Sequence, residues 1–308
     1  MDALESAGMH GPLESLGVPG HRRLGLDGPR GWWPTAPRLK SYEAAGFGYV
    51  QLWIPDRALL SQPDAIGVHG TALWETLRLT SLRLILHAPE ELFAGTAEHD
   101  RQLDGALSYA ALTGAEMMVY HGAQVPVGAP GVHERLVEER RSLRRALRRA
   151  SALGVRIAIQ NHAPRYPGIE ERVAENPLAV DELVRWLDSD AVGMCLDLGH
   201  AHIVAGLAGC ELVELTEPVL DRVIVFCVHD NFGAAPGAPR SGGIEPLRLD
   251  LHMPPGAGTV PWAGLAPMLA SHGAPLQLEV HPNLRPEPAT LAILARELLG
   301  LRAPLRVA

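Results

Sequence analysis

Short runs of apolar residues recur along the chain, separated mostly by longer stretches that carry apolar residues at helical spacing. Eight runs have strand length: Arg23 to Leu26, Tyr49 to Ile54, Leu82 to Leu86, Met117 to Tyr120, Val155 to Ile159, Val192 to Leu196, Val223 to Val228 and Leu276 to Leu278. Helical periodicity covers 100–112, 133–153, 179–187 and 286–299. Because alternating strands and helices imply parallel pairing with right-handed crossovers, the pattern predicts a (β/α)8 barrel, the TIM barrel, rather than a doubly wound sheet.

The domain organisation follows from the same pattern. Residues 1–20 are rich in Gly and Pro without clear periodicity, which predicts a loose N-terminal arm. Residues 21–308 then form a single barrel domain. No GxGxxG or GxxxxGK[ST] motif follows the first predicted strand, so no dinucleotide or P-loop phosphate site is expected there.

The polar residues at or near the ends of the predicted strands form the first group of candidate functional residues. They are His87, His121, Gln160, Asp197, Cys227 and Glu279. Side chains alternate along a strand, and Gln277 and Glu279 share a parity opposite to that of Leu276 and Leu278. Since barrel enzymes carry their chemistry at the carboxyl ends of the strands, these side chains are expected to meet at one mouth.

The stretch from Val192 to His202 adds a further candidate ligand, His200, close to Asp197. It places Asp197 at the end of a strand and His200 three residues later, where a helix should begin. Asp250 and His252 form another carboxylate and imidazole pair in a later loop. Carboxylate oxygens and neutral imidazoles are common metal ligands, so these nine residues predict a metal site.

Two long loops follow predicted strands and are expected to act as lids or binding loops. They span 163–177 and 231–258, and the second is rich in Gly and Pro, which predicts mobility in the absence of ligand. Arg165, Arg240 and Arg248 in these loops are candidates for binding a phosphate or carboxylate group. The arginines of the 133–153 helix are instead expected on its solvated outer face.

Composition narrows the class of protein. Hydrophobic residues make up 47% and charged residues 20% of the 308-residue chain, and no apolar run reaches the length of a membrane-spanning helix. Three cysteines at unrelated spacings predict no disulfide framework, which together with the lack of a visible secretory signal favours a cytoplasmic protein. The net charge of -8 disfavours nucleic acid. The expected partners are a small-molecule substrate and, in a homo-oligomer, further copies of the chain.

Seven motifs in order resemble those of the xylose isomerase-like TIM barrels, a superfamily of sugar isomerases, epimerases, related dehydratases and family 2 AP endonucleases. They are HAP at His87, YHGA at His121, QNH at Gln160, CLDLGHAH around Asp197, VHDNFG at His229, DLHMPPGAGTVPW from Asp250 and LEVHP around Glu279. The resemblance covers roughly 45–282. It implies a mononuclear metal shell at Gln160, Asp197, Cys227 and Glu279, or a trinuclear zinc centre that also uses His87, His121, His200, Asp250 and His252.

Two positions depart from both metal patterns. Gln160 stands where a metal-binding Glu is expected, and Cys227 stands where a His is expected. A neutral amide is a poor ligand and cannot accept a proton, whereas a thiolate suits zinc better than Mn or Mg. Gln51 also replaces a Glu that is common in the isomerases.

The resemblance implies a metal-dependent isomerase, epimerase or dehydratase acting on a sugar, a cyclitol or another hydroxy-carbonyl compound by proton abstraction next to a carbonyl, with Zn, Mn or Mg. Glu279 is the expected base, and His121, His162 or His200 replaces the second carboxylate. The expected substrate-binding residues are Asn161, His162, Arg165, His229, Asp230 and Arg248. The alternatives are a zinc phosphoesterase of the AP-endonuclease type and a repurposed barrel with a degraded metal site.

Overall fold

Eight parallel strands close into a barrel, as the sequence predicts. The computed structural model describes residues 23–122, 124–164, 171–235 and 250–301. Strand order follows the chain, and the first strand pairs with both the second and the eighth. The strands are β1 (Leu24–Asp27), β2 (Tyr49–Trp53), β3 (Arg83–His87), β4 (Met117–His121), β5 (Arg156–Gln160), β6 (Val192–Asp197), β7 (Val223–Val228) and β8 (Leu276–Leu278).

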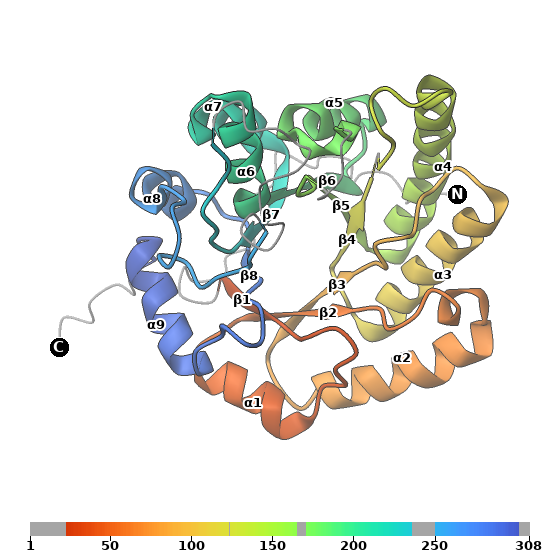
Figure 1. Ribbon diagram of the computed structural model, residues 1–308. Coiled ribbons are helices and arrows are strands. Elements are labelled where there is room, and N and C mark those ends of the chain that lie inside the picture. The colour runs from red at the N-terminus through yellow and green to blue at the C-terminus, as the bar shows by residue number, and fades with distance from the viewer. Residues whose placement is uncertain (1–22, 123, 165–170, 236–249, 302–308) are drawn as a thin grey trace, which may run out of the picture.

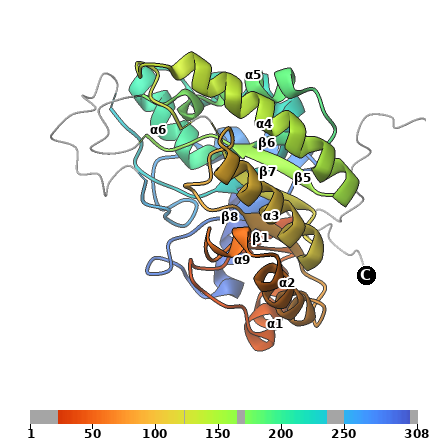
Figure 2. The ribbon, with the colours of Figure 1, turned by 90° about the vertical axis from the view of Figure 1, so that its right-hand side faces the viewer.

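Helices surround the strands and cover the outside of the barrel (Figure 1, Figure 2). The α-helices are α1 (Ala36–Ala44), α2 (Pro63–Leu77), α3 (Ala97–Thr113), α4 (Val132–Leu153), α5 (Pro177–Leu187), α6 (Leu198–Ala208), α7 (Leu212–Thr216), α8 (Trp262–Ser271) and α9 (Pro288–Leu298). Short 3-10 helices are η2 (Leu59–Ser61), η3 (Val173–Glu175) and η4 (Glu217–Arg222). Among the helices of the described ranges, none is long and apolar enough to cross a membrane.

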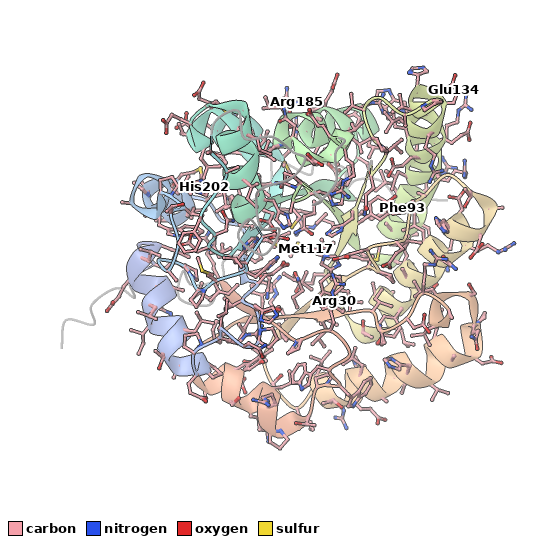
Figure 3. The ribbon with its side chains drawn as sticks, viewed as in Figure 1. Arg30, Phe93, Met117, Glu134, Arg185 and His202 are labelled. Carbon is pink, nitrogen blue, oxygen red and sulfur yellow. The ribbon has the colours of Figure 1, made fainter. Side chains whose placement is uncertain are left out.

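Side-chain alternation along the strands separates two apolar layers, which confirms the predicted parity. Leu84, Leu86 and Leu278 point outward into the large core between strands and helices. Ile85 and Val119 belong to a smaller cluster inside the barrel. Met117, also in that inner cluster, lies among the strands at the centre of Figure 3, whereas Glu134 and Arg185 lie on the outer helices. Residues that continue the inner parity therefore reach the carboxyl mouth of the barrel.

The arginine-rich helix α4 lies outside the barrel, as predicted. It buries Leu143, Ala146 and Leu147 against the strands. Its arginines turn away from the core, and Arg144 stacks over Trp186 with its guanidinium carbon 4.1 Å from the ring centre. The basic run is thus a solvated helix face.

The loop after β7 is described only from 229 to 235 and from 250 onward, so Arg240 and Arg248 lie outside the described residues. Its later part is firmly attached, because Asp230 and Met253 exchange both backbone hydrogen bonds at 2.8 and 2.9 Å. The Asp230 carboxylate also accepts hydrogen bonds from backbone N–H groups of Gly256 and Val260 and from the Trp262 indole. These contacts hold Asp250 and His252 near the barrel mouth.

Candidate metal and active site

The ends of several strands and the loops after them line one cavity of about 310 Å³ at the carboxyl mouth. Its polar lining includes most of the ligands predicted from the sequence: His87, His121, Gln160, His200, Asp250, His252 and Glu279. The predicted ligands Asp197 and Cys227 lie in contact with that lining and are fully buried. The structure therefore brings all nine candidate ligands together.

His200, Asp250 and His252 converge on one point at the mouth. The Nε2 atoms of His200 and His252 lie 3.4 and 3.2 Å from the same oxygen, Oδ1 of Asp250. In each imidazole the Nδ1 atom faces a backbone carbonyl, that of Asn161 at 2.9 Å and that of Glu279 at 2.8 Å. Donation from Nδ1–H to a carbonyl leaves Nε2 as the atom available to a metal, which is the usual orientation of a histidine ligand.

We call His200, Asp250 and His252 the metal triad, and the pKa values of its three side chains depend strongly on one another. Burial alone would lower the pKa of His200, but the carboxylates of Asp197 and Asp250 raise it to about 9. Burial is likewise outweighed at His252, where Asp250 raises the pKa to about 10. The two imidazoles in turn hold the pKa of Asp250 well below its usual range, against the effect of burial. Without a metal, two protonated imidazoles balance the carboxylates, and a divalent ion would replace their two protons.

The isomerase-type shell differs from the group of His200, Asp250 and His252. Its two carboxylates, Asp197 and Glu279, already accept hydrogen bonds from protein donors. Asp197 accepts hydrogen bonds from Gln160 Nε2 at 3.0 Å, from the His200 backbone N–H at 2.8 Å and from His229 Nε2 at 3.0 Å. Glu279 Oε1 accepts from Gln51 Nε2 at 2.6 Å and from the Cys227 thiol at 3.0 Å. Although burial opposes it, His200 and His229 also keep the pKa of Asp197 below its ordinary value.

Gln160 connects this shell to the other two histidines. Its Oε1 lies 2.8 Å from Nε2 of His121 and 3.2 Å from Nε2 of His87. Burial lowers the pKa of both histidines, and at His121 the neighbouring imidazoles lower it further. Both are therefore neutral at pH 7, and Gln160 occupies the point on which their Nε2 atoms converge.

The donor sets differ in how well they suit a metal ion. His200, Asp250 and His252 offer two oriented nitrogens and one carboxylate oxygen, a combination that suits zinc and related divalent ions. The ligand atoms of Asp197, Cys227 and Glu279 also lie within 4.8 Å of one another. This second set contains a thiol and lacks the expected Glu and His, so it does not suit Mg or Mn.

The predicted substrate-binding residues take several different places. His162 lines the cavity, and its Nε2 lies 2.9 Å from the carbonyl of Gly122. Asn161 is buried and clamps β6, since its amide exchanges hydrogen bonds with the backbone N–H and carbonyl of Asp197 at 2.8 and 3.0 Å. His229 stacks on His252 with the ring centres 3.8 Å apart. Asp230 turns into its own loop, as described above, and Arg165 lies outside the described residues.

Sequence reasoning missed the wall of the cavity formed by β2 and the loop after β1. Trp53 stacks on His87 with the ring centres 3.6 Å apart, and Arg30 lies over the same indole at 4.1 Å and pairs with Glu90. Asp27, at the end of β1, pairs with Arg285. The sequence contained a signal for this wall, because both residues lie at the ends of predicted strands. Asp27 directly follows the predicted first strand, and Trp53 is the next-to-last residue of the predicted second strand.

Fold and site together define a (β/α)8 barrel with a mouth rich in candidate metal ligands. The sequence profile of the xylose isomerase-like TIM barrel family matches residues 39–298, so the chain belongs to this family. Among curated proteins, no sequence matches the chain.

Solved structures agree on the fold. A D-tagatose 3-epimerase-like protein has a TM-score of 0.67 and 17% identity, over 90% of this chain and 97% of that one. A xylose isomerase domain protein from Alicyclobacillus acidocaldarius has a TM-score of 0.64 and 19% identity, over 90% and 98%. A Thermus thermophilus protein soaked with zinc chloride has a TM-score of 0.59 and 22% identity, over 92% and 99%.

Proposed function

We propose that the protein is a metal-dependent isomerase or epimerase of a small hydroxy-carbonyl compound, such as a sugar or cyclitol derivative. The main support is the convergence of three side chains on one point of the cavity. His200, Asp250 and His252 aim two imidazole nitrogens and one carboxylate oxygen at a common point in the cavity that Glu279 also lines. A Lewis acid and a base then face the same substrate.

The metal would be held by His200, Asp250 and His252, and when bound it supplies stabilisation of negative charge on a substrate oxygen. Glu279 removes the proton from the carbon next to the carbonyl. Gln51 and Cys227 donate hydrogen bonds to Oε1 of Glu279 and fix its orientation. Because Gln160 cannot carry a proton, Glu279 would return the proton to the neighbouring carbon on the same face, which is a one-base isomerisation. Epimerisation would need a proton donor on the opposite face, and His121, which lines the cavity, is the candidate for it.

The size and chemistry of the cavity support a small substrate. A volume of about 310 Å³ is at the lower end for small-molecule sites, and its lining is mostly polar and aromatic. Trp53, stacked against His87, offers an apolar wall, while His121 and His162 offer hydrogen-bonding edges. The likeness to a D-tagatose 3-epimerase-like protein supports a sugar as the class of substrate.

Proton abstraction can be tested without knowing the substrate. The metal-free protein is reloaded with Zn, Mn or Mg and incubated with a panel of ketoses, aldoses and inososes in deuterated water, and NMR follows deuterium entry next to the carbonyl. We expect exchange that Glu279→Gln abolishes while the bound metal is retained. His252→Ala should lose both the metal and exchange, whereas His133→Ala, on the exposed face of α4, should lose neither. Metal binding without exchange of any compound would contradict the proposal.

A zinc phosphoesterase is the second candidate, because the ligands expected for it are present at the mouth, except at positions 160 and 227. Two observations weigh against DNA as its substrate: the net charge is -8, and the cavity volume of about 310 Å³ is that of a small-molecule site. Hydrolysis of simple phosphate esters by the zinc-loaded protein, with no deuterium exchange, would favour this candidate. Neither reaction and no bound metal would favour a repurposed barrel.

A further inference from the structure

Two cysteines meet inside the barrel, beneath the cavity. Cys195 on β6 and Cys227 on β7 belong to the inner cluster, are fully buried, and have sulfur atoms 3.4 Å apart. Neither lines the cavity itself. The third cysteine, Cys210, lies just beyond the end of α6 and is partly exposed. The pair is thus a distinct cluster of thiols within the barrel.

Charged and polar side chains lie next to the thiol pair. Cys227 Sγ lies 3.0 Å from Glu279 Oε1, and Asp197 has a carboxylate oxygen within 4.8 Å of both ligand atoms. Gln277, the register partner of Cys227 on β8, is fully buried, and neither atom of its amide has a hydrogen-bond partner among the residues that the structure describes. A buried amide left without partners is costly, so the interior beside the thiols contains a polar group that the neighbouring side chains do not satisfy.

The geometry points to a second metal centre in which the thiolates of Cys195 and Cys227 and the carboxylate of Glu279 bind one soft divalent ion, zinc or cadmium. Tetrahedral zinc places two sulfur ligands about 3.8 Å apart and a sulfur and an oxygen ligand about 3.5 Å apart. The observed distances of 3.4 and 3.0 Å are each within about half an ångström of those values. Small side-chain adjustments would therefore accommodate the ion.

The chemistry of the donors decides which ion binds. Thiolates favour zinc and cadmium over magnesium and manganese, so we expect this centre not to bind magnesium or manganese. On binding, each thiol releases one proton to solvent, and the ion enters with no change of oxidation state. Glu279 borders both the cavity and the thiols, so we expect the ion to enter from the cavity past this side chain. If Glu279 is the base, as the proposed function requires, zinc added beyond the one ion held by the metal triad would occupy this centre and inhibit proton abstraction, whereas manganese and magnesium would not.

Cadmium titration of the reduced full-length protein tests the second centre, because cadmium bound to thiolate has an ultraviolet charge-transfer band that histidine and carboxylate ligands do not produce. We expect a band that saturates at one ion and is unchanged in Cys210→Ser, the matched control. Cys227→Ser should lose most of the band, and Cys195→Ser should lose about half. This readout does not depend on catalysis, so a failure of the proposed enzyme function would leave it interpretable.

Three results would overturn the inference. No band in the parent would mean that the thiols bind no ion. Loss of the band in Cys210→Ser would assign it to the surface cysteine. An unchanged band in Cys195→Ser would reduce the centre to the single thiolate of Cys227. If a serine variant fails to fold by circular dichroism, Cys195→Ala or Cys227→Val replaces it, since each fills the buried position with an apolar group.

Discussion

At the scale of single residues, Gln160 decides how the mouth of the barrel is organised. Its carbonyl oxygen contacts His87 and His121, and its amide nitrogen donates to Asp197. A Glu at this position would place a second negative charge 3.0 Å from Asp197, where the amide now donates a hydrogen bond. The amide therefore lets the mouth stay folded without a cation at that point.

Gln160→Glu should reverse this arrangement. Without metal, repulsion from Asp197 should lower the free energy of unfolding by about 1–3 kcal/mol, because a buried hydrogen bond becomes a contact between carboxylates. With zinc or manganese, the variant should gain more thermal stability than the parent, since the added carboxylate binds the ion. Thermal unfolding with EDTA and with each ion measures both effects.

Gln124→Glu is the matched control, because Gln124 lines the same cavity but contacts Glu90 and Arg172 rather than Asp197. It should show no additional gain with metal. Equal gains in the parent, in Gln160→Glu and in the control would mean that position 160 has no part in metal binding.

The residue scale also shows where sequence reasoning succeeds. Strand parity placed His87, His121 and Glu279 at the mouth, because alternation is dictated by backbone geometry. It did not reveal that Cys195 and Cys227 touch. Their contact depends on the lateral pairing of β6 with β7, which shifts register between Met194 and Cys195. A shift of this kind leaves no periodic trace in the sequence.

At the scale of elements, the segment after β7 carries two of the three proposed metal ligands although it is irregular. The Asp230 carboxylate organises it by accepting hydrogen bonds from Gly256, Val260 and the Trp262 indole. His252 itself has a positive φ of 47°, a conformation that is uncommon for a residue with a side chain. Its metal-ligand geometry therefore depends on a well-anchored loop.

Asp230→Ala should weaken metal binding although Asp230 does not line the cavity. Loss of the hydrogen bonds that the Asp230 carboxylate accepts should free the loop, displace Asp250 and His252, and lower zinc affinity by about 10–100-fold. Isothermal titration with zinc measures this effect, and Asp190→Ala, which removes an exposed carboxylate, is the control. Unchanged zinc affinity in a folded Asp230→Ala protein would show that the loop does not position these ligands.

Regular elements were predicted better than irregular ones. All eight strands and the four helices named from periodicity lie within a few residues of their predicted bounds. The other five α-helices of the described residues, α1, α2, α6, α7 and α8, received no bounds from periodicity. Glycines interrupt α2 at Gly67 and Gly70, and a proline interrupts α8 at Pro267. The predicted lid over 231–258 remains a prediction for its central part, while its end is anchored by Asp230.

At the scale of the whole molecule, the alternation of strands and helices was enough to predict a closed barrel, because parallel strands with helical crossovers allow few topologies. The order of motifs predicted which residues meet at its mouth. The sequence did not predict that the carboxylates of the isomerase-type shell would be hydrogen-bonded to Gln51, Gln160 and Cys227, since these pairings join strands distant in the chain. The metal selectivity that we propose rests on those long-range pairings.

The stability of the whole protein should depend on pH through the metal triad. In the metal-free protein the pKa values of His200 and His252 are raised to about 9 and about 10, against about 6.5 in an unfolded chain. The native state thus binds more protons than the unfolded state between these values. This contribution to stability is complete below about pH 6.5 and is lost as the pH rises toward 10.

Zinc should reverse that trend, because the ion binds neutral imidazoles and no longer competes with protons at high pH. We expect the melting temperature in EDTA to fall from pH 7 to pH 9, and the increase caused by zinc to be larger at pH 9. Asp250→Asn removes a carboxylate that raises both pKa values, so its melting temperature in EDTA should depend less on pH. His133→Ala, an exposed imidazole, should behave like the parent. Identical pH profiles in the parent and in Asp250→Asn would mean that the triad does not hold these protons.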